Sequence, residues 1–423
     1  MSRLAALRHG ALAAQPGQIP AVRIMVAANL LLALRVVPLP QGSIGVNILA
    51  TLLCSFLARG AQRRRAGLGT GLALLALLYG GLAFGLDFLD AALGKVLLSS
   101  VLFILVCLSL ENLAARIDLS RPLLERGDLW AVTGLALLGL GAEEAVLCFQ
   151  GQPGRASGLF AEPSHLAMVM APVLFYLWQT AAGRERPAVA LAGLALFLLS
   201  PSSTFLFLLL GMAILFRLAA TTTLKQAGRL LAPALATGMV LLGFLQTPYA
   251  GPTRRRVADI LAFSEDSNLS SLVYLNGWML LAAYLDESRG RGVGFNAMGV
   301  GRNPATAASG YLAALDLDDQ NAFEGSFTLA KLGSELGCVG IAIWCGFLLL
   351  TWQAGRAWFP AGAPVLPANR VALFSLLSMV SVSGVIRSAG YFTGPFVLGL
   401  FALFVALSRN LPARPRANPA GAP

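Results

Sequence analysis

The chain has 423 residues, of which 57% are apolar and only 12% are charged, and its mean hydropathy is +0.73. This composition is typical of a protein with many membrane-spanning helices, and it excludes a soluble fold. The formal net charge of +11 would indicate nucleic-acid binding in a soluble protein. In a membrane protein, the same excess is expected from basic loops on the cytoplasmic side.

The apolar runs predict an all-α, polytopic membrane protein with about 12 transmembrane helices, since open sheet edges cannot face lipid. No cleavable signal peptide is evident, because the first run is followed by "VVPLPQGS" without a small-residue cleavage pattern. The even number of spans, together with short basic loops, predicts that both termini are cytoplasmic. The expected spans are 21–36, 43–58, 68–88, 94–113, 129–149, 164–181, 187–200, 203–219, 230–247, 326–351, 369–387 and 392–408.

The long stretch 248–325 is the exception to the short loops, and we expect it to be a large periplasmic loop within a single membrane domain, 1–423. Its apolar part, 270–285, is too short to span comfortably, so we expect a helix that lies in the interface or caps the bundle. The tail 409–423 is basic and rich in proline, and we predict that it is disordered in the cytoplasm.

Metal and disulfide chemistry are not expected. The five cysteines lie within or at the ends of apolar runs and form no CxxC pair, and the chain has only two histidines. Asp316, Asp318 and Asp319 are typical of a solvated loop face, with divalent-cation binding as the alternative. We therefore predict no metal site and no cofactor.

The segment "RASGLFAEPSHLAM" (155–168) places Arg155, Glu162 and His165 at the mouth of an apolar run. Pro163 and Ser164 fit a helix start, which would put Glu162 at the positive end of the helix dipole. Two interpretations stay open at this point. The carboxylate takes part in chemistry, or it only caps a helix while Arg155 anchors at the lipid headgroups.

Further cations on the predicted outer side are candidates for phosphate binding, because arginine matches phosphate oxygens bidentately and stays charged. The alternatives are headgroup anchors, solvated loop charges and, for Lys331, a simple pair with Glu335 four residues on. "GVGFNAMGVG" lacks the form of a nucleotide loop. The candidate residues are Arg254, Arg255, Arg256, Arg289, Arg291, Arg302, Lys331 and Arg387.

Taken together, these elements resemble the Wzy-type O-antigen and exopolysaccharide polymerases. "GLFAEPSHLA" is similar to their G-[FL]-F-x-E-P-S element, and "SPSSTFLFLLLGMAIL" is similar to their next span. "GVGFN" followed by "GSFTLAKLGSELGCVGI" resembles the stretch that leads out of their periplasmic loop. The likeness covers 155–345, and the termini match only in hydropathy.

The resemblance implies a GT-C-like fold and a metal-independent glycosyltransferase of the bacterial inner membrane. Such an enzyme transfers glycan from undecaprenyl diphosphate to a sugar hydroxyl of another lipid-linked repeat unit at the periplasmic face. It implies Glu162, Arg155 and His165 as catalytic candidates, and a chain-length regulator and a flippase as partners besides the lipid bilayer, with no nucleic acid. An O-antigen ligase is the alternative within the superfamily, but ligases usually carry His-Asn where this chain has Gln320-Asn321. A flippase or other transporter is the alternative from another class.

Overall fold

The computed structural model describes most of the chain, and structural statements below refer to these residues alone. They are 18–31, 35–39, 42–58, 67–84, 93–117, 122–150, 156–158, 160, 162–221, 246, 251, 254, 258, 267, 269–300, 303–317, 323, 325–359, 366–387 and 390–410.

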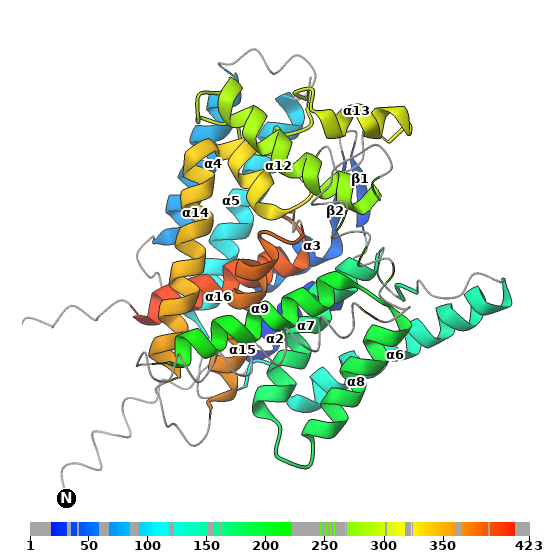
Figure 1. The fold of residues 1–423 in the computed structure, drawn as a ribbon. Helices are drawn as coiled ribbons and strands as arrows, with labels where there is room; N and C mark the ends of the chain where they lie inside the picture. The colour runs from blue at the N-terminus through cyan, green and yellow to red at the C-terminus, as the bar shows by residue number, and fades with distance from the viewer. Residues whose placement is uncertain are drawn as a thin grey trace, which may run out of the picture.

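The described chain is mainly helical, with one short antiparallel hairpin between the first two helices. Figure 1 shows a bundle in which the long helix α14 lies along one side. The elements in order are α2 (Gln18–Leu31), β1 (Arg35–Leu39), β2 (Gly42–Gly45), α3 (Val46–Leu57), α4 (Leu68–Phe84), α5 (Leu93–Ala115), α6 (Arg126–Phe149), α7 (Pro163–Thr180), α8 (Arg186–Leu199), α9 (Ser203–Ala220), α12 (Leu269–Glu287), α13 (Ala307–Ala314), α14 (Thr328–Trp358), α15 (Ala368–Ser383) and α16 (Gly394–Asn410).

The structure confirms a helical, membrane-type protein, although the number of spans stays a prediction. Every expected span except 230–247, of which the structure describes only residue 246, overlaps a helix. Four of these helices are long and apolar enough to cross a membrane: Gly94–Ala115, Arg126–Phe149, Ser203–Ala220 and Thr328–Trp358. The described chain also has six shorter apolar helices of 10–17 residues.

The first expected span, 21–36, was wrong at its end. We expected helix up to residue 36, but Arg35–Leu39 forms the strand β1 and pairs with β2. β-branched Val36 and Val37 favour a strand, and Pro38 cannot continue a helix interior. The apolar character of the run concealed this change of local preference.

The prediction of a helix over 270–285 is confirmed by α12. This helix packs against α13 and α14, and Figure 1 shows it crossing the same end of the bundle as the start of α14. Its depth relative to a bilayer stays a prediction.

The core of the bundle contains α7, α15 and α16. Helix α15 packs against both α7 and α16. In α7 every residue from Leu166 to Leu177 is buried, as expected for a helix that is apolar all round. By contrast, α6 and α8 project from the lower right of Figure 1 and expose large apolar side chains such as Leu138 and Leu191. An exposed apolar face on such a helix is the face that lipid would cover.

Helix α14 is broken at Gly337, whose backbone has φ 61° and ψ −142°. The break frees carbonyl groups of the preceding turn, and a glycine-rich loop from before α13 pairs with them. The Val293 amide donates to the Ser334 carbonyl, and the Gly294 amide donates to the Glu335 carbonyl. A Cβ at Gly337 would lie 2.0 Å from the Gly290 carbonyl oxygen, so only glycine fits where the two backbones meet.

Helix ends that the sequence places on the same side of the membrane lie together. The beginning of α7 contacts the end of α15 through Glu162 and Arg387. At the other ends of the helices, Arg126 at the start of α6 forms an ion pair with Glu185, which precedes α8. This grouping agrees with alternating spans, while the orientation in the membrane stays a prediction.

Candidate functional site

An ion pair joins two segments that are far apart in the sequence. Arg387 Nη2 lies 2.6 Å from Glu162 Oε2, and the Ser164 hydroxyl donates to the same oxygen at 2.9 Å. The Glu162 side chain is 47% exposed and that of Arg387 is 19% exposed. Arg387 Nε is buried, and the described part of the chain offers it no hydrogen-bond partner. The pair therefore keeps one buried donor without a partner among the described residues, as do Arg23 and Arg126.

The local backbone explains where the Glu162 carboxylate points. Glu162 is the N-cap residue of α7, in an extended conformation, and Pro163 begins the helix as the sequence predicted. The side chain of Glu162 makes no capping hydrogen bond to the α7 backbone. The carboxylate therefore forms no hydrogen-bonded cap, and its Oε2 atom accepts from Arg387 and Ser164 instead, while its interaction with the helix dipole stays a prediction. His165 lies half-buried in the first turn of α7.

The loop before Glu162 is held by a carboxylate that the sequence analysis missed. Glu143 Oε2, on α6, accepts hydrogen bonds from the backbone amides of Ser157, at 2.7 Å, and Gly158. Gly158 has φ 64°, and a Cβ there would approach the Leu140 amide to 3.3 Å. The signal in the sequence was the pair of carboxylates, Glu143 and Glu144, inside an otherwise apolar helix.

A second ion pair lies inside the protein on the first part of α14. Lys331 Nζ is 2.9 Å from Glu335 Oε1, and the two side chains are 4% and 0% exposed. Lys331 also donates to the Phe323 carbonyl at 2.6 Å. The interpretation that Lys331 pairs with Glu335 is confirmed. The Lys331 ammonium is buried and already bonded to Glu335 and to the Phe323 carbonyl, so it could bind an anionic ligand only if these contacts broke.

Tyr391 connects this buried pair to the turn that carries Arg387. We call residues 384–387 and 390–393 the α15–α16 turn. The Tyr391 hydroxyl donates to Glu335 Oε2 at 2.6 Å. Burial raises the pKa of Tyr391 well above its usual value, and the neighbouring carboxylate raises it further. The phenol therefore stays protonated and remains a hydrogen-bond donor at ordinary pH.

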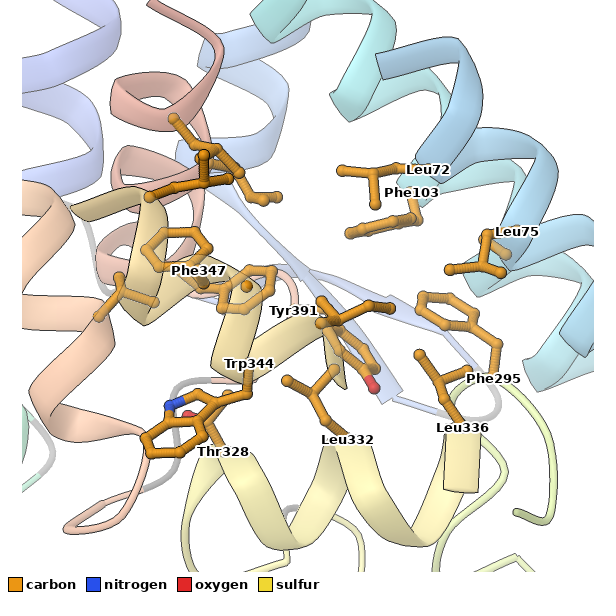
Figure 2. Close-up of a pocket in the computed structure, with 18 residues that line it drawn as sticks. Leu72, Leu75, Phe103, Phe295, Thr328, Leu332, Leu336, Trp344, Phe347 and Tyr391 are labelled. Carbon is orange, nitrogen blue, oxygen red and sulfur yellow. The ribbon is translucent and has the colours of Figure 1, made fainter. Parts of the chain in front are cut away.

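An apolar cavity of about 220 Å³ lies between α4, α5, α14, α15 and α16. Figure 2 shows Leu332 on one side of it and Leu72 and Phe103 on the other, with Phe295 and Tyr391 between them. Phe295 stacks on Tyr391 with ring centroids 4.7 Å apart. The lining residues are Leu72, Leu75, Ala76, Phe103, Phe295, Thr328, Leu332, Leu336, Ile343, Trp344, Gly346, Phe347, Leu350, Val380, Tyr391, Phe396, Leu400 and Leu403.

The cavity and the Glu162–Arg387 pair share a border. Thr328 lines the cavity, and its hydroxyl oxygen lies 3.5 Å from the carbonyl oxygen of Arg387. The Leu329 amide donates to the Gly384 carbonyl at 2.8 Å, which ties the beginning of α14 to the same turn. One end of the apolar cavity is thus built from the turn that positions the arginine.

Other candidate cations are not joined to this pair. Arg254, Arg289 and Arg291 are exposed, and Arg291 Nε donates to the Ser288 carbonyl at 3.1 Å. No hydrogen bond or ion pair links them to Glu162 or Arg387 within the described chain. Their phosphate-binding role stays a prediction. The expectations for Arg155, Arg255, Arg256 and Arg302 fall outside the described residues.

In the part of the chain that the structure describes, no three histidine, cysteine or acidic side chains gather as metal ligands would. Asp316 is described, whereas Asp318 and Asp319 lie outside the described residues. No family model, curated protein or solved structure matches this chain. The case for a function therefore depends on the residues and their geometry.

Proposed function

We propose that this chain is a bacterial surface-polysaccharide or exopolysaccharide polymerase of the inner membrane. It would transfer glycan from undecaprenyl diphosphate to a sugar hydroxyl of another lipid-linked repeat unit at the periplasmic face. The observation that carries the proposal is the Glu162–Arg387 pair at the edge of an apolar cavity, which α5 and α14, two helices long and apolar enough to cross a membrane, help to line. The resemblance of "GLFAEPSHLA" to the polymerase element supports the same reaction.

Arg387 fits the electrostatic requirement of the reaction. When the glycosidic bond to the diphosphate breaks, negative charge grows on the leaving phosphate, and a fixed guanidinium in a water-poor site stabilises that charge. Arg387 is 19% exposed, and its Nε is a buried donor without a partner among the described residues. A phosphate oxygen at this edge of the guanidinium would satisfy that donor.

Glu162 has two roles that its geometry supports. One carboxylate oxygen, Oε2, accepts from Arg387 and Ser164, so it fixes the guanidinium. With 47% of the side chain exposed, the carboxylate also has room to accept the proton of an acceptor hydroxyl. The contact with Arg387 supports the orienting role directly, and the role as a base rests on exposure and chemistry.

The apolar cavity, of about 220 Å³, fits a short part of the donor's lipid chain. Its lining is almost wholly hydrocarbon and aromatic, which suits a polyprenyl chain and would exclude a sugar or a phosphate. Because Thr328 belongs to both the cavity wall and the support of Arg387, a chain in the cavity would bring its diphosphate toward the arginine.

The test measures elongation by the purified full-length protein in lipid nanodiscs. The substrate is the lipid-linked repeat extracted from the native host after deletion of the gene. Wild-type protein should lengthen these repeats without added metal, in the presence of EDTA. Glu162→Gln and Arg387→Lys should impair elongation strongly, the first by about 10²–10⁴-fold if the carboxylate is the base.

Another ion pair, between Arg23 and Glu125, provides a matched control. Arg23 and Glu125 form a pair of 3.0 Å with side chains 33% and 62% exposed, at the opposite ends of the helices. Arg23→Lys and Glu125→Gln should leave elongation near the wild-type rate. Absence of elongation by wild-type protein would overturn the proposal. Transfer to lipid A core alone would indicate a ligase, and movement of the intact lipid across the bilayer alone would indicate a transporter.

A further inference from the structure

Glu335 is the most fully hydrogen-bonded carboxylate of the candidate site, although nothing in its sequence position requires this. It is 0% exposed, and it accepts from four donors. Lys331 Nζ lies at 2.9 Å and the Tyr391 hydroxyl at 2.6 Å. The backbone amides of Asn296 and Met298 donate at 2.9 Å and 3.4 Å. A buried carboxylate is tolerated only when its charge is compensated in this way.

The donors come from three separate segments, so Glu335 joins them. Lys331 lies one turn earlier on α14, and Asn296 and Met298 belong to the loop that pairs with the broken end of this helix. Tyr391 belongs to the α15–α16 turn, four positions after Arg387. The carboxylate is the point at which α14, the glycine-rich loop and the turn that carries Arg387 meet.

Other contacts hold the backbone of the α15–α16 turn as well. In its second half, Asn47 Nδ2, on α3, donates to the Phe392 carbonyl at 3.0 Å, and the remaining contacts hold its first half. Gly384 accepts from the Leu329 amide at 2.8 Å, and the Val385 carbonyl accepts from the Tyr274 hydroxyl at 3.0 Å. The second half is fixed to α14 through the Tyr391 hydroxyl on Glu335. Arg387 lies between these two attachments. Its guanidinium contacts Glu162, which lies 225 positions earlier in the sequence.

We propose that Glu335 is a positioning residue for Arg387, acting through the Tyr391 hydroxyl, and that it binds no substrate itself. The inference rests on the proposed function, because it assigns a task to Arg387. Its physical basis is the rigidity that the Tyr391–Glu335 hydrogen bond gives to the α15–α16 turn. A charge-assisted hydrogen bond in a buried site fixes the turn, so that the guanidinium meets Glu162 and the donor diphosphate without prior reordering.

The test compares two buried tyrosines that make hydrogen bonds of equal length. Tyr391→Phe removes the hydroxyl on Glu335 and keeps the ring that lines the cavity. Tyr284→Phe is the matched control, since this hydroxyl donates at 2.6 Å to Asn303 and has no contact with the α15–α16 turn among the described residues. Glu335→Gln is the second test variant, and Tyr391→Phe keeps the test open if that variant folds poorly.

The first measurement is amide hydrogen exchange of the full-length protein in detergent. Tyr391→Phe should speed exchange in peptides that cover 384–393, and Tyr284→Phe should leave those peptides unchanged. Unchanged exchange in Tyr391→Phe would overturn the positioning role. This measurement does not depend on activity, so it separates failure of this inference from failure of the proposed function, which would appear as wild-type protein that does not elongate.

The second measurement is binding of undecaprenyl diphosphate, made as a double-mutant cycle. Tyr391→Phe alone should weaken binding about tenfold, the usual worth of a hydrogen bond to a charged group. In an Arg387→Ala background, the same change should weaken binding no further, because the arginine through which it acts is gone. An equal loss in both backgrounds would show a general structural effect and would contradict the proposal.

Discussion

The two ion pairs at this end of the protein use the same chemistry in opposite settings. Lys331–Glu335 is enclosed, with side chains 4% and 0% exposed, and further donors complete the carboxylate. Arg387–Glu162 is open, with side chains 19% and 47% exposed, and Arg387 Nε has no partner within the described chain. An enclosed and completed pair stabilises structure, whereas an open and incomplete pair can accept a ligand.

The two pairs also differ in sequence separation, which explains why one was easier to interpret from the sequence than the other. Lys331 and Glu335 are four residues apart, and a helix brings such residues together by itself. Arg387 and Glu162 meet only because α7 and α15 pack with these ends adjacent. Breaking each pair in turn therefore tests whether stability or activity changes more.

The largest expected effect comes from breaking the enclosed pair. Glu335→Ala should lower the free energy of unfolding by about 3–5 kcal/mol, because it leaves the Lys331 ammonium buried without its counter-ion. Arg23→Ala, at the more exposed Arg23–Glu125 pair, should cost about 1 kcal/mol or less. Unfolding of detergent-solubilised protein in urea measures both. Similar losses for the two variants would contradict the contrast between enclosed and open pairs.

Breaking the open pair should change activity more than stability. Arg387→Ala should lower the turnover number for elongation by about 10²–10³-fold, the usual loss when one preorganised donor is removed from a developing anion. Its unfolding free energy should change far less than that of Glu335→Ala. The measurement pairs initial elongation rates with the urea transition. Near-normal turnover, or loss of activity only in step with unfolding, would return Arg387 to a structural role.

A smaller effect is expected at the carboxylate that holds the loop before Glu162. Glu143→Gln should cost about 1.5–3 kcal/mol of stability, because Glu143 accepts two backbone amides as a charged group. Glu144→Gln is the neighbouring control, since the Glu144 carboxylate accepts no backbone amide in the described chain. Thermal unfolding monitored by circular dichroism compares them. An equal cost at both positions would remove the special role of Glu143.

The smallest expected effect is at Ser164. Ser164→Ala removes one of the two hydrogen bonds to Glu162 Oε2 and leaves Arg387 in place. Because this hydrogen bond is exposed to solvent, we expect it to contribute only about 1 kcal/mol, so elongation should slow no more than about fivefold. Initial rates at saturating donor measure this change. A loss as large as that of Arg387→Ala would mean that the serine, and not the arginine, fixes the carboxylate.

Most of the helices could be predicted because each is encoded by a continuous apolar run. The hairpin could not, because Arg35–Leu39 continues the apolar run of α2 and only its β-branched residues mark the change. Glu162 was found through its costly setting at the start of a span. Glu143 and Tyr391 were missed because their roles arise from contacts with distant segments, which neither periodicity nor spacing reveals.

The break at Gly337 also sets how deep the polar residues of α14 would lie in a bilayer. The whole helix has 31 residues, which at 1.5 Å per residue is about 46 Å and exceeds the roughly 30 Å hydrocarbon core. The part after the break, from Cys338 to Trp358, is about 30 Å long by the same measure and matches that thickness. We therefore predict that Gly337 marks a membrane boundary and that Lys331 and Glu335 lie at headgroup level.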